Sequence, residues 1–230
     1  MKTVLITGAN RGIGLEHARR YAEAGAHVLA TARDPAAASE LAALRGRSSG
    51  AVDVFVYDAA AENAAAPLKQ AIGDRPIDLL LANAGSMGKF MRFGDADVEA
   101  ILDLVRVNAL APLQLAEAFA DNVAASERKV MAFQSSLMGS VGDNGSGGFY
   151  DYRISKAALN MVAKGVANDL RARGVVSIAL HPGWVRTRMG GPSATVSVEA
   201  CVEGQQLLLE RVRHSESGSF FNYDGRVLPW

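Results

Sequence analysis

Tyr152 and Lys156 are the residues of the chain whose types and spacing most directly suggest chemistry. They open a stretch, residues 152–172, that is rich in helix-forming residues and is predicted to be a helix. Residues four apart lie on one face of a helix, so the phenol and the ammonium point the same way. A free phenol titrates near pH ~10, and a neighbouring positive charge favours its ionised form. The pair is a candidate acid–base unit, although a Tyr and a Lys at this spacing are more often a plain surface pair.

Three glycines near the start of the chain form a second motif. Gly8, Gly12 and Gly14 lie between residues 4–6, an apolar run predicted to be a buried strand, and a predicted helix that ends at Ala24. Glycines let the backbone turn sharply and approach a pyrophosphate, and a helix N-terminus supplies free N–H groups and a partial positive charge. A plain glycine turn is the alternative, but the position between a strand and a helix favours nucleotide binding.

Short apolar strands alternate with helices along the rest of the chain, and Pro112 is expected to kink or interrupt one of these helices. This alternation predicts an α/β fold, a doubly wound parallel sheet of about seven strands with helices on both faces, in one domain spanning residues 1–230. Further strands are predicted over residues 27–31, 54–57, 77–81, 129–133, 176–180 and 219–222, and helices over 36–43, 97–115, 152–172 and 197–213.

Several motifs directly follow predicted strands. Because the carboxyl ends of parallel strands share one edge of a doubly wound sheet, where ligands bind, we expect these motifs to converge. They are residues 8–14, Asp58, Asn83-Ala84-Gly85, Ser135-Ser136 and Pro182-Gly183.

Composition excludes several classes of function. The formal net charge of zero argues against a nucleic-acid partner or an anionic membrane surface. The single cysteine, Cys201, forms no internal disulfide, and the chain has neither a C-x-x-C nor an H-E-x-x-H motif, so no metal site is expected. No apolar run approaches ~18 residues, and the first predicted strand leaves no room for a signal peptide. We therefore expect a cytoplasmic protein that does not span a membrane.

Taken together, these motifs resemble the short-chain dehydrogenase/reductase family. The resemblance implies a Rossmann-type fold and nicotinamide-dependent oxidation of alcohols or reduction of carbonyls. Residues 147–153, 182–187 and 223–230 further resemble the C-factor-like and sniffer-type carbonyl reductases. The family motifs are Thr7-Gly8-x-x-x-Gly12-x-Gly14, Asn83-Ala84-Gly85, Asn108, Ser136, Tyr152-x-x-x-Lys156, and Pro182-Gly183 with Thr187.

The resemblance also implies roles for individual residues. Tyr152 would give its proton to the carbonyl oxygen, Lys156 would hold the nicotinamide ribose and lower the pKa of Tyr152, and Ser136 would hydrogen-bond the substrate oxygen. Asn108 would anchor a water that leads from Lys156 to solvent, or would instead satisfy helix backbone at the kink. The expected cofactor contacts are Gly8, Asn10, Arg11, Gly12, Ile13, Gly14, Arg33, Asp58, Asn83, Ala84, Gly85, Tyr152, Lys156, Pro182, Gly183, Val185 and Thr187.

Some assignments have rivals. Ser136 lies further before Tyr152 than in the commonest family pattern, which leaves Ser135 and Ser140 as alternatives. Ser136 is favoured because it directly follows a strand and because Ser135-Ser136-x-x-Gly139 matches the family's serine motif. Tyr150 lies six residues before Lys156 and cannot share its helix face. Asn83 is expected to brace the sheet, and the histidine at position 181 is expected to be structural.

The end of the second strand indicates which cofactor is bound. An NAD enzyme of this kind usually has an acid there to hold the ribose hydroxyls, but this chain has Ala32, followed by Arg33. A guanidinium can grip a 2′-phosphate in two places, so NADPH is favoured over NADH. Asp34 is expected to cap the next helix, with Pro35 in its first turn, and Asp58 to accept from the adenine amino group.

The leading hypothesis is an NADPH-dependent carbonyl reductase that acts on a small-molecule carbonyl or alcohol. The alternative is a nucleotide-binding signalling or sensor protein of the C-factor type with little turnover. A hydrolase is disfavoured because no G-x-S-x-G motif is present. The substrate walls are expected from residues 86–94, 138–151 and 188–195, and a homodimer is expected to form through residues 97–115 and 152–172.

Overall fold

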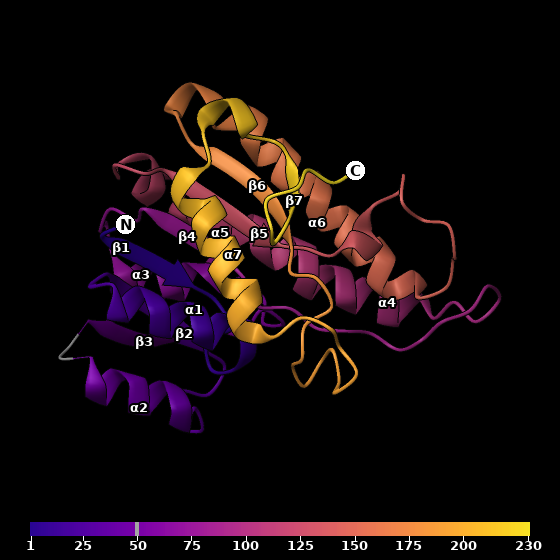
Figure 1. Cartoon of the computed structure of the whole chain (residues 1–230), viewed down its shortest axis with the longest axis horizontal. Coiled ribbons are helices and arrows are strands. Elements are labelled where there is room, and N and C mark those ends of the chain that lie inside the picture. Colours follow the sequence, from indigo (N-terminus) through magenta and orange to yellow (C-terminus); the bar gives the residue numbers. More distant parts are fainter. Residues whose placement is uncertain (49–50) are drawn as a thin grey trace.

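A parallel sheet of seven strands forms the centre of the computed structural model, which describes residues 1–48 and 51–230 (Figure 1). The strand order is β3-β2-β1-β4-β5-β6-β7, so the chain winds outward from β1 first in one direction and then, from β4, in the other. The predicted doubly wound fold is confirmed. The strands are β1 (Thr3–Ile6), β2 (His27–Ala32), β3 (Val52–Val56), β4 (Leu79–Ala82), β5 (Val130–Gln134), β6 (Val176–His181) and β7 (Phe220–Asn222).

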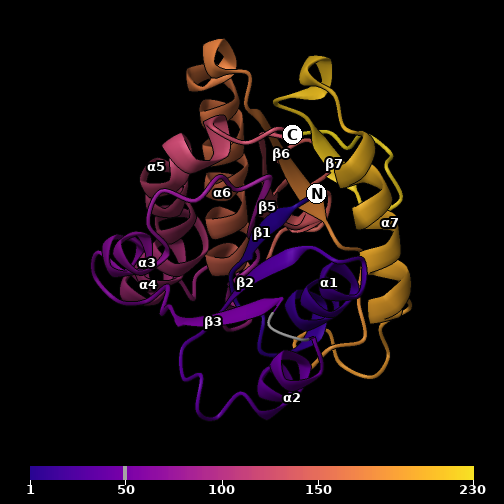
Figure 2. The ribbon, with the colours of Figure 1, turned by 90° about the vertical axis from the view of Figure 1, so that its left-hand side faces the viewer.

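Helices cover both faces of this sheet, as Figure 2 shows. One face carries α1 (Gly12–Glu23), α2 (Ser39–Arg47) and α7 (Val198–Arg211), and the other carries α3 (Ala65–Ile72), α4 (Val98–Val105), α5 (Ala111–Ala124) and α6 (Tyr150–Asp169). Successive strand residues point to opposite faces. Val4 and Ile6 therefore pack with the α1 and α7 side, whereas Leu5 packs with Leu115 and Phe119 on the other side.

The helix predicted over residues 97–115 is interrupted, as expected near Pro112. Asp97 caps α4 by accepting a hydrogen bond from the backbone N–H of Ala100 (3.1 Å). A π-helical turn, Arg106–Leu110, then separates α4 from α5. Pro112 has no N–H for the carbonyl of Asn108 four residues earlier, which is why the regular hydrogen-bond pattern cannot continue here.

The predicted start of the second helix and its predicted cap are both wrong. The helix expected over residues 36–43 begins only at Ser39, and Asp34 does not cap it. The Asp34 carboxylate instead accepts from the backbone N–H groups of Ala36 and Ala37 (3.0 and 3.3 Å), which closes a separate turn. Asp residues form such turns as readily as helix caps. Helix α3 was not predicted, because eight residues are too short for a helical period to stand out.

Candidate active site

The glycine turn has a backbone shape that requires glycine. Gly8 and Gly12 have φ angles of 64° and 55°, in the left-handed region that other residues rarely adopt. A Cβ at Gly14 would overlap the carbonyl oxygen of Gly8 and lie 2.6 Å from Nδ2 of Asn83. The backbone N–H of Ala9 donates to the carbonyl of Thr31 (2.8 Å), which ties the turn to the end of β2. The turn therefore presents its backbone at the N-terminus of α1, where a pyrophosphate fits.

Asn83 braces this turn from the end of β4, as expected. Its Nδ2 donates to the carbonyls of Thr7 (2.9 Å) and Gly8 (3.2 Å). The Thr7 hydroxyl in turn accepts from the backbone N–H groups of Asn83 and Ala84, each at 3.0 Å. A Cβ at Gly8 would approach Cα of Ala84 to 3.0 Å, so the two strand ends are in close contact.

Ser136, Tyr152 and Lys156 come together where β5 meets α6. All three side chains are buried. The Lys156 ammonium lies 5.7 Å from the centre of the Tyr152 ring and donates to the carbonyl of Gln134 (2.8 Å). Ser136 is the second residue after β5, and its hydroxyl is close enough to the Tyr152 phenol to lower the pKa of that phenol. A Cβ at Gly139 would lie 2.6 Å from the backbone of Lys156, so only glycine allows this loop to pack on the helix.

The rival serines have other partners. Ser135 donates to Oδ1 of Asn160 (2.5 Å), and Ser140 accepts from the backbone N–H of Asp143 (3.1 Å). Ser136 also accepts from the backbone N–H of Met138 (3.2 Å), which fixes the start of the following loop.

The protonation equilibria of the pair follow from burial. Burial raises the pKa of Tyr152, and the hydrogen bond with Ser136 opposes part of that rise. Burial lowers the pKa of Lys156 to about 8. The expected lowering of the Tyr152 pKa by Lys156 is therefore not the dominant effect, because desolvation of the phenol outweighs it.

The side-chain amide of Asn108 contacts the loop after β4 and α6. Its Oδ1 accepts from the backbone N–H of Ser86 (2.8 Å), and its Nδ2 donates to the carbonyl of Ser86 (2.8 Å) and to the hydroxyl of Ser155 (3.0 Å). The amide thus braces the loop after β4 rather than backbone at the helix kink. A Cβ at Gly85 would lie 3.1 Å from Asn108 and 3.6 Å from the Lys156 ammonium, so these three residues are neighbours.

Three arginines gather near the glycine turn. Arg33 is exposed directly after β2, and Arg11 lies in the turn itself. Burial and the positive charges of Arg188 and Arg33 lower the pKa of Arg11. Within residues 1–48 and 51–230, none of these three guanidiniums forms an ion pair with a carboxylate, whereas Arg19 is bound by two glutamates. Unpaired guanidiniums at one place favour an anion, and a cofactor phosphate suits them.

Arg188 was expected in the substrate wall of residues 188–195, but it was missed as a residue that could contact the cofactor. The signal was its position next to Thr187, whose methyl group lies 3.5 Å from the place of a Cβ on Gly12. Thr187 also accepts from the backbone N–H of Gly190 (3.1 Å), and Val185 pairs with Val196.

The remaining expected cofactor residues lie at the same edge of the sheet. Asn10 and Ile13 belong to the glycine turn, Asp58 follows β3, and Pro182 and Gly183 follow β6. Asp58 closes its own turn by accepting from the backbone N–H of Ala60 (3.1 Å).

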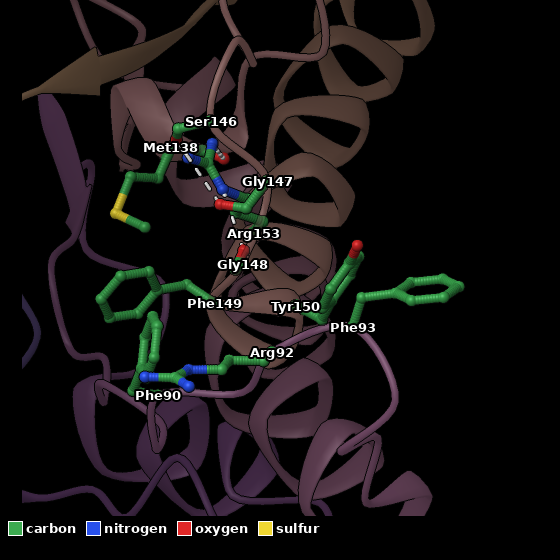
Figure 3. Close-up of a pocket in the computed structure, with 10 residues that line it drawn as sticks. All are labelled: Phe90, Arg92, Phe93, Met138, Ser146, Gly147, Gly148, Phe149, Tyr150 and Arg153. Carbon is green, nitrogen blue, oxygen red and sulfur yellow. Dashed lines mark hydrogen bonds between the residues drawn. The ribbon is translucent and has the colours of Figure 1, made fainter.

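A cavity of about 530 Å³ lies between the loop after β4 and the start of α6 (Figure 3). Its lining includes Met138 and Arg153, which are close in sequence to Ser136 and Tyr152, but not Ser136, Tyr152 or Lys156 themselves. It joins two of the three expected wall segments, residues 86–94 and 138–151, but not residues 188–195. Figure 3 shows the side chains of Phe90, Phe149 and Met138 on one side, and those of Phe93 and Tyr150 on the other. The lining residues are Phe90, Arg92, Phe93, Met138, Ser146, Gly147, Gly148, Phe149, Tyr150 and Arg153.

The described part of the chain holds neither a cluster of metal ligands nor a membrane-spanning helix. No group of three His, Cys, Asp or Glu side chains there could hold a metal ion. None of the helices described is both long and apolar enough to cross a membrane.

Residues 2–196 match the family model for short chain dehydrogenases. A C-signal protein of Myxococcus xanthus is 40% identical over 155 residues, which cover 67% of this chain and 93% of that protein. The structure of the carbonyl reductase Sniffer of D. melanogaster is 30% identical with a TM-score of 0.90, and the match covers 100% of both chains. An NADPH-bound carbonyl reductase from chicken fatty liver has the same identity and TM-score, covering 100% of this chain and 99% of that one.

Proposed function

Because the chain belongs to the short-chain dehydrogenase family, we propose that it is an NADPH-dependent oxidoreductase that reduces an aldehyde or ketone to an alcohol, or catalyses the reverse. The observation that carries this proposal is the meeting of Ser136, Tyr152 and Lys156 beside the glycine turn, at the carboxyl edge of the sheet. Ligands bind at this edge in doubly wound folds.

The residues around the turn fit NADPH. The backbone of residues 8–14 would hold the pyrophosphate, and Arg11, Arg33 and Arg188 would hold the phosphates, with Arg33 on the 2′-phosphate. The strand that would carry an acid in an NAD enzyme ends at the buried Ala32. The NADPH-bound structure of the chicken carbonyl reductase supports the same choice. NADH is the disfavoured cofactor.

Each catalytic side chain has a task that its position supports. When bound, the cofactor supplies a hydride to the carbonyl carbon. The Tyr152 phenol gives its proton to the carbonyl oxygen, and the Ser136 hydroxyl stabilises the negative charge that develops there. Lys156 holds the ribose and restores the proton through a water near Asn108.

The proposal is tested by loss of NADPH absorbance in the presence of a panel of aldehydes, ketones and quinones. Turnover with at least one carbonyl, and a weaker response with NADH, is the expected result. A chain that binds NADPH but consumes none with any carbonyl would contradict it. That outcome would favour a signalling or sensor protein of the C-factor type, for which the 40% identity with the C-signal protein is the supporting observation.

A homodimer is part of the proposal. Val98 and Leu102 on α4 and Ile154 and Met161 on α6 are apolar yet 43–70% exposed. Exposed apolar side chains on neighbouring helices are typical of a protein interface. Light scattering should give twice the mass of one chain, and Met161→Glu should return the monomer.

A further inference from the structure

A buried carboxylate joins the loop after β4 to the first turn of the helix that carries Tyr152. Asp151 is 1% exposed and is the second residue of α6. Its Oδ1 accepts from the backbone N–H of Tyr152 (2.7 Å), and its Oδ2 accepts from the backbone N–H of Lys89 (2.8 Å). A negative charge in the first turn of a helix is also stabilised by the helix dipole. Each oxygen of the carboxylate thus serves a different segment of the chain.

Gly88 fits against this carboxylate only because it has no side chain. A Cβ at Gly88 would overlap Oδ2 of Asp151 and would also lie 2.9 Å from Cδ2 of Leu104 on α4. The backbone at residues 88–89 is therefore wedged between α4 and the start of α6. We call these contacts of Asp151 with Gly88 and Lys89 the Asp151 clasp.

A second set of contacts joins the same two segments, at Met91 after Lys89 and at Phe149 before Asp151. The backbone N–H of Phe149 donates to the carbonyl of Met91 (2.8 Å). Phe149 has a φ of 51°, in the left-handed region that a bulky residue adopts only when its surroundings enforce it. Its ring meets that of Phe90 edge to face, with centroids 4.6 Å apart (Figure 3). The Asp151 clasp and the contact between the two rings together fix the position of the Phe90 side chain.

The position of Phe90 matters for substrates because Phe90 lines the cavity between the loop after β4 and the start of α6, the helix that carries Tyr152 and Lys156. Phe90, Phe149 and Met138 form an apolar wall on one side of it. Met138 is bound to Ser136 through its backbone, and Phe149 lies three residues before Tyr152. The wall is thus attached at both ends to the residues that would handle the carbonyl.

We propose that Asp151 is a positioning residue that holds the apolar wall on the catalytic helix and so sets the affinity for carbonyl compounds with a bulky apolar body. This inference rests on the proposed carbonyl reduction. Small aldehydes do not reach the wall, so their turnover depends on Ser136, Tyr152 and Lys156 and not on the clasp.

The matched test compares Asp151→Asn with Asp95→Asn, an exposed carboxylate close to the same loop. Asparagine has one acceptor oxygen, so it can serve the N–H of Tyr152 or that of Lys89 but not both. In Asp151→Asn the KM for 2-naphthaldehyde should rise about tenfold, the usual scale of one lost buried hydrogen bond. The kcat, the KM for propanal and the affinity for NADPH should stay within about twofold. Asp95→Asn should change none of these values.

Hydrogen exchange gives a readout that does not depend on turnover. In Asp151→Asn the amide of Lys89 and its neighbours in residues 86–94 should exchange at least about tenfold faster, while amides of the sheet keep their protection. Equal losses for both aldehydes, or unchanged exchange in residues 86–94, would overturn the proposal. If the wild type reduces no carbonyl of the panel, the proposed function fails, and exchange alone then decides whether the clasp exists.

A double-mutant cycle tests the contact itself. Gly88→Ala alone should raise the KM for 2-naphthaldehyde as Asp151→Asn does, because the new methyl group displaces the carboxylate. In an Asp151→Ala background the clash with the carboxylate is gone and only the contact with the flexible end of Leu104 remains, so Gly88→Ala should add less than about twofold. Independent effects that multiply would show that the two residues do not act as one clasp.

Discussion

At the scale of single residues, the phenol of Tyr152 is the group whose removal should be most specific. Tyr152→Phe deletes a single oxygen and leaves the rest of the buried ring in place, so the fold and NADPH binding should persist. Turnover should fall by roughly 10²–10⁴, the usual contribution of a general acid. Steady-state rates measure this, with Tyr150→Phe as the control. Near-normal activity of Tyr152→Phe together with an inactive Tyr150→Phe would reverse the assignment.

Lys156 leads to a prediction about pH. Alcohol oxidation needs the phenolate of Tyr152, whose pKa is raised by burial, so the oxidation rate should increase with pH. The Lys156 ammonium favours the phenolate only while it is charged, and its pKa is about 8. In Lys156→Met the rise should therefore shift to higher pH, with the largest deficit below about pH 8 and convergence above it.

This comparison is made on rates at saturating NADP⁺ and alcohol, because the variant also loses a cation that would hold the ribose. Superimposable pH profiles would show that Lys156 positions the ribose without affecting the ionisation of Tyr152.

Arg33 is expected to decide between the two nicotinamide cofactors. Arg33→Ala removes an exposed guanidinium with no carboxylate partner in the described residues, so the fold should be unaffected. The dissociation constant for NADPH should rise by roughly 10–100-fold, since a hydrogen bond to a charged group contributes about 1.5–3 kcal/mol. Fluorescence titration should show little change for NADH. Equal losses for both cofactors would mean that Arg33 is structural.

At the scale of elements, the glycine turn should tolerate no side chain at position 14. Gly14→Ala would place a methyl group against the carbonyl of Gly8 and the amide of Asn83, and the backbone there cannot move without breaking the brace to β4. We expect loss of detectable NADPH binding and a lower melting temperature. Gly165→Ala in α6, where a Cβ meets nothing within 4 Å, is the control and should be neutral or slightly stabilising. Retained NADPH affinity in Gly14→Ala would contradict the assigned role of the turn.

How much of this could be predicted from sequence depends on whether the signal is local. The order of strands and helices was predicted because each strand is a short apolar run, and the convergence of Ser136 with residues 8–14 follows from the sheet alone. The contacts of Asn108 with Ser86 and Ser155 could not be predicted, because they join three segments through a side chain. The predicted start of α2 was wrong because Asp34 could either cap a helix or close a separate turn, and the sequence does not distinguish the two.

The electrostatics of the site were the least accessible to sequence reasoning. The spacing of Tyr152 and Lys156 showed that they share a helix face, but not how deeply both are buried. Burial raises the pKa of Tyr152, whereas the sequence predicted that Lys156 would lower it. The burial itself depends on packing against residues of a distant loop, such as Gly139. Arg188 was missed for the same reason, since only the fold brings it near Arg11.

At the scale of the whole molecule, a row of buried, hydrogen-bonded side chains connects α1 and α7 to the central sheet. Nε2 of His17 on α1 is bonded to Oε1 of Gln205 on α7 (2.9 Å), and Nε2 of Gln205 donates to Oε1 of Gln134 at the end of β5 (3.3 Å). His17 is completely buried, and its Nδ1 has no partner among the described residues. A proton added to this ring would place an uncompensated charge in the core.

The buried His17 in this row of side chains should make the stability of the fold sensitive to acid. Burial lowers the pKa of His17 to about 4, against 6.5 for an unperturbed histidine. Above pH 6.5 the ring is neutral in both the folded and the unfolded chain, and the full stability is present. Between pH 6.5 and 4 only the unfolded chain takes up the proton, so the free energy of unfolding should decrease with falling pH, by about 3 kcal/mol in all from this residue. His181, whose pKa is also lowered to about 4 by burial, should add to the same trend.

Urea unfolding at a series of pH values measures the effect. His17→Gln keeps a neutral donor for Gln205 but cannot titrate, so its free energy of unfolding should depend less on pH between 4 and 6.5 even if the variant is less stable throughout. His214→Gln, at an exposed position, is the control and should keep the wild-type slope. If His17→Gln and the wild type lose stability in parallel as the pH falls, then His17 takes up its proton equally in the folded and unfolded chain. The carboxylates, and not the buried histidine, would then account for the acid sensitivity of the molecule.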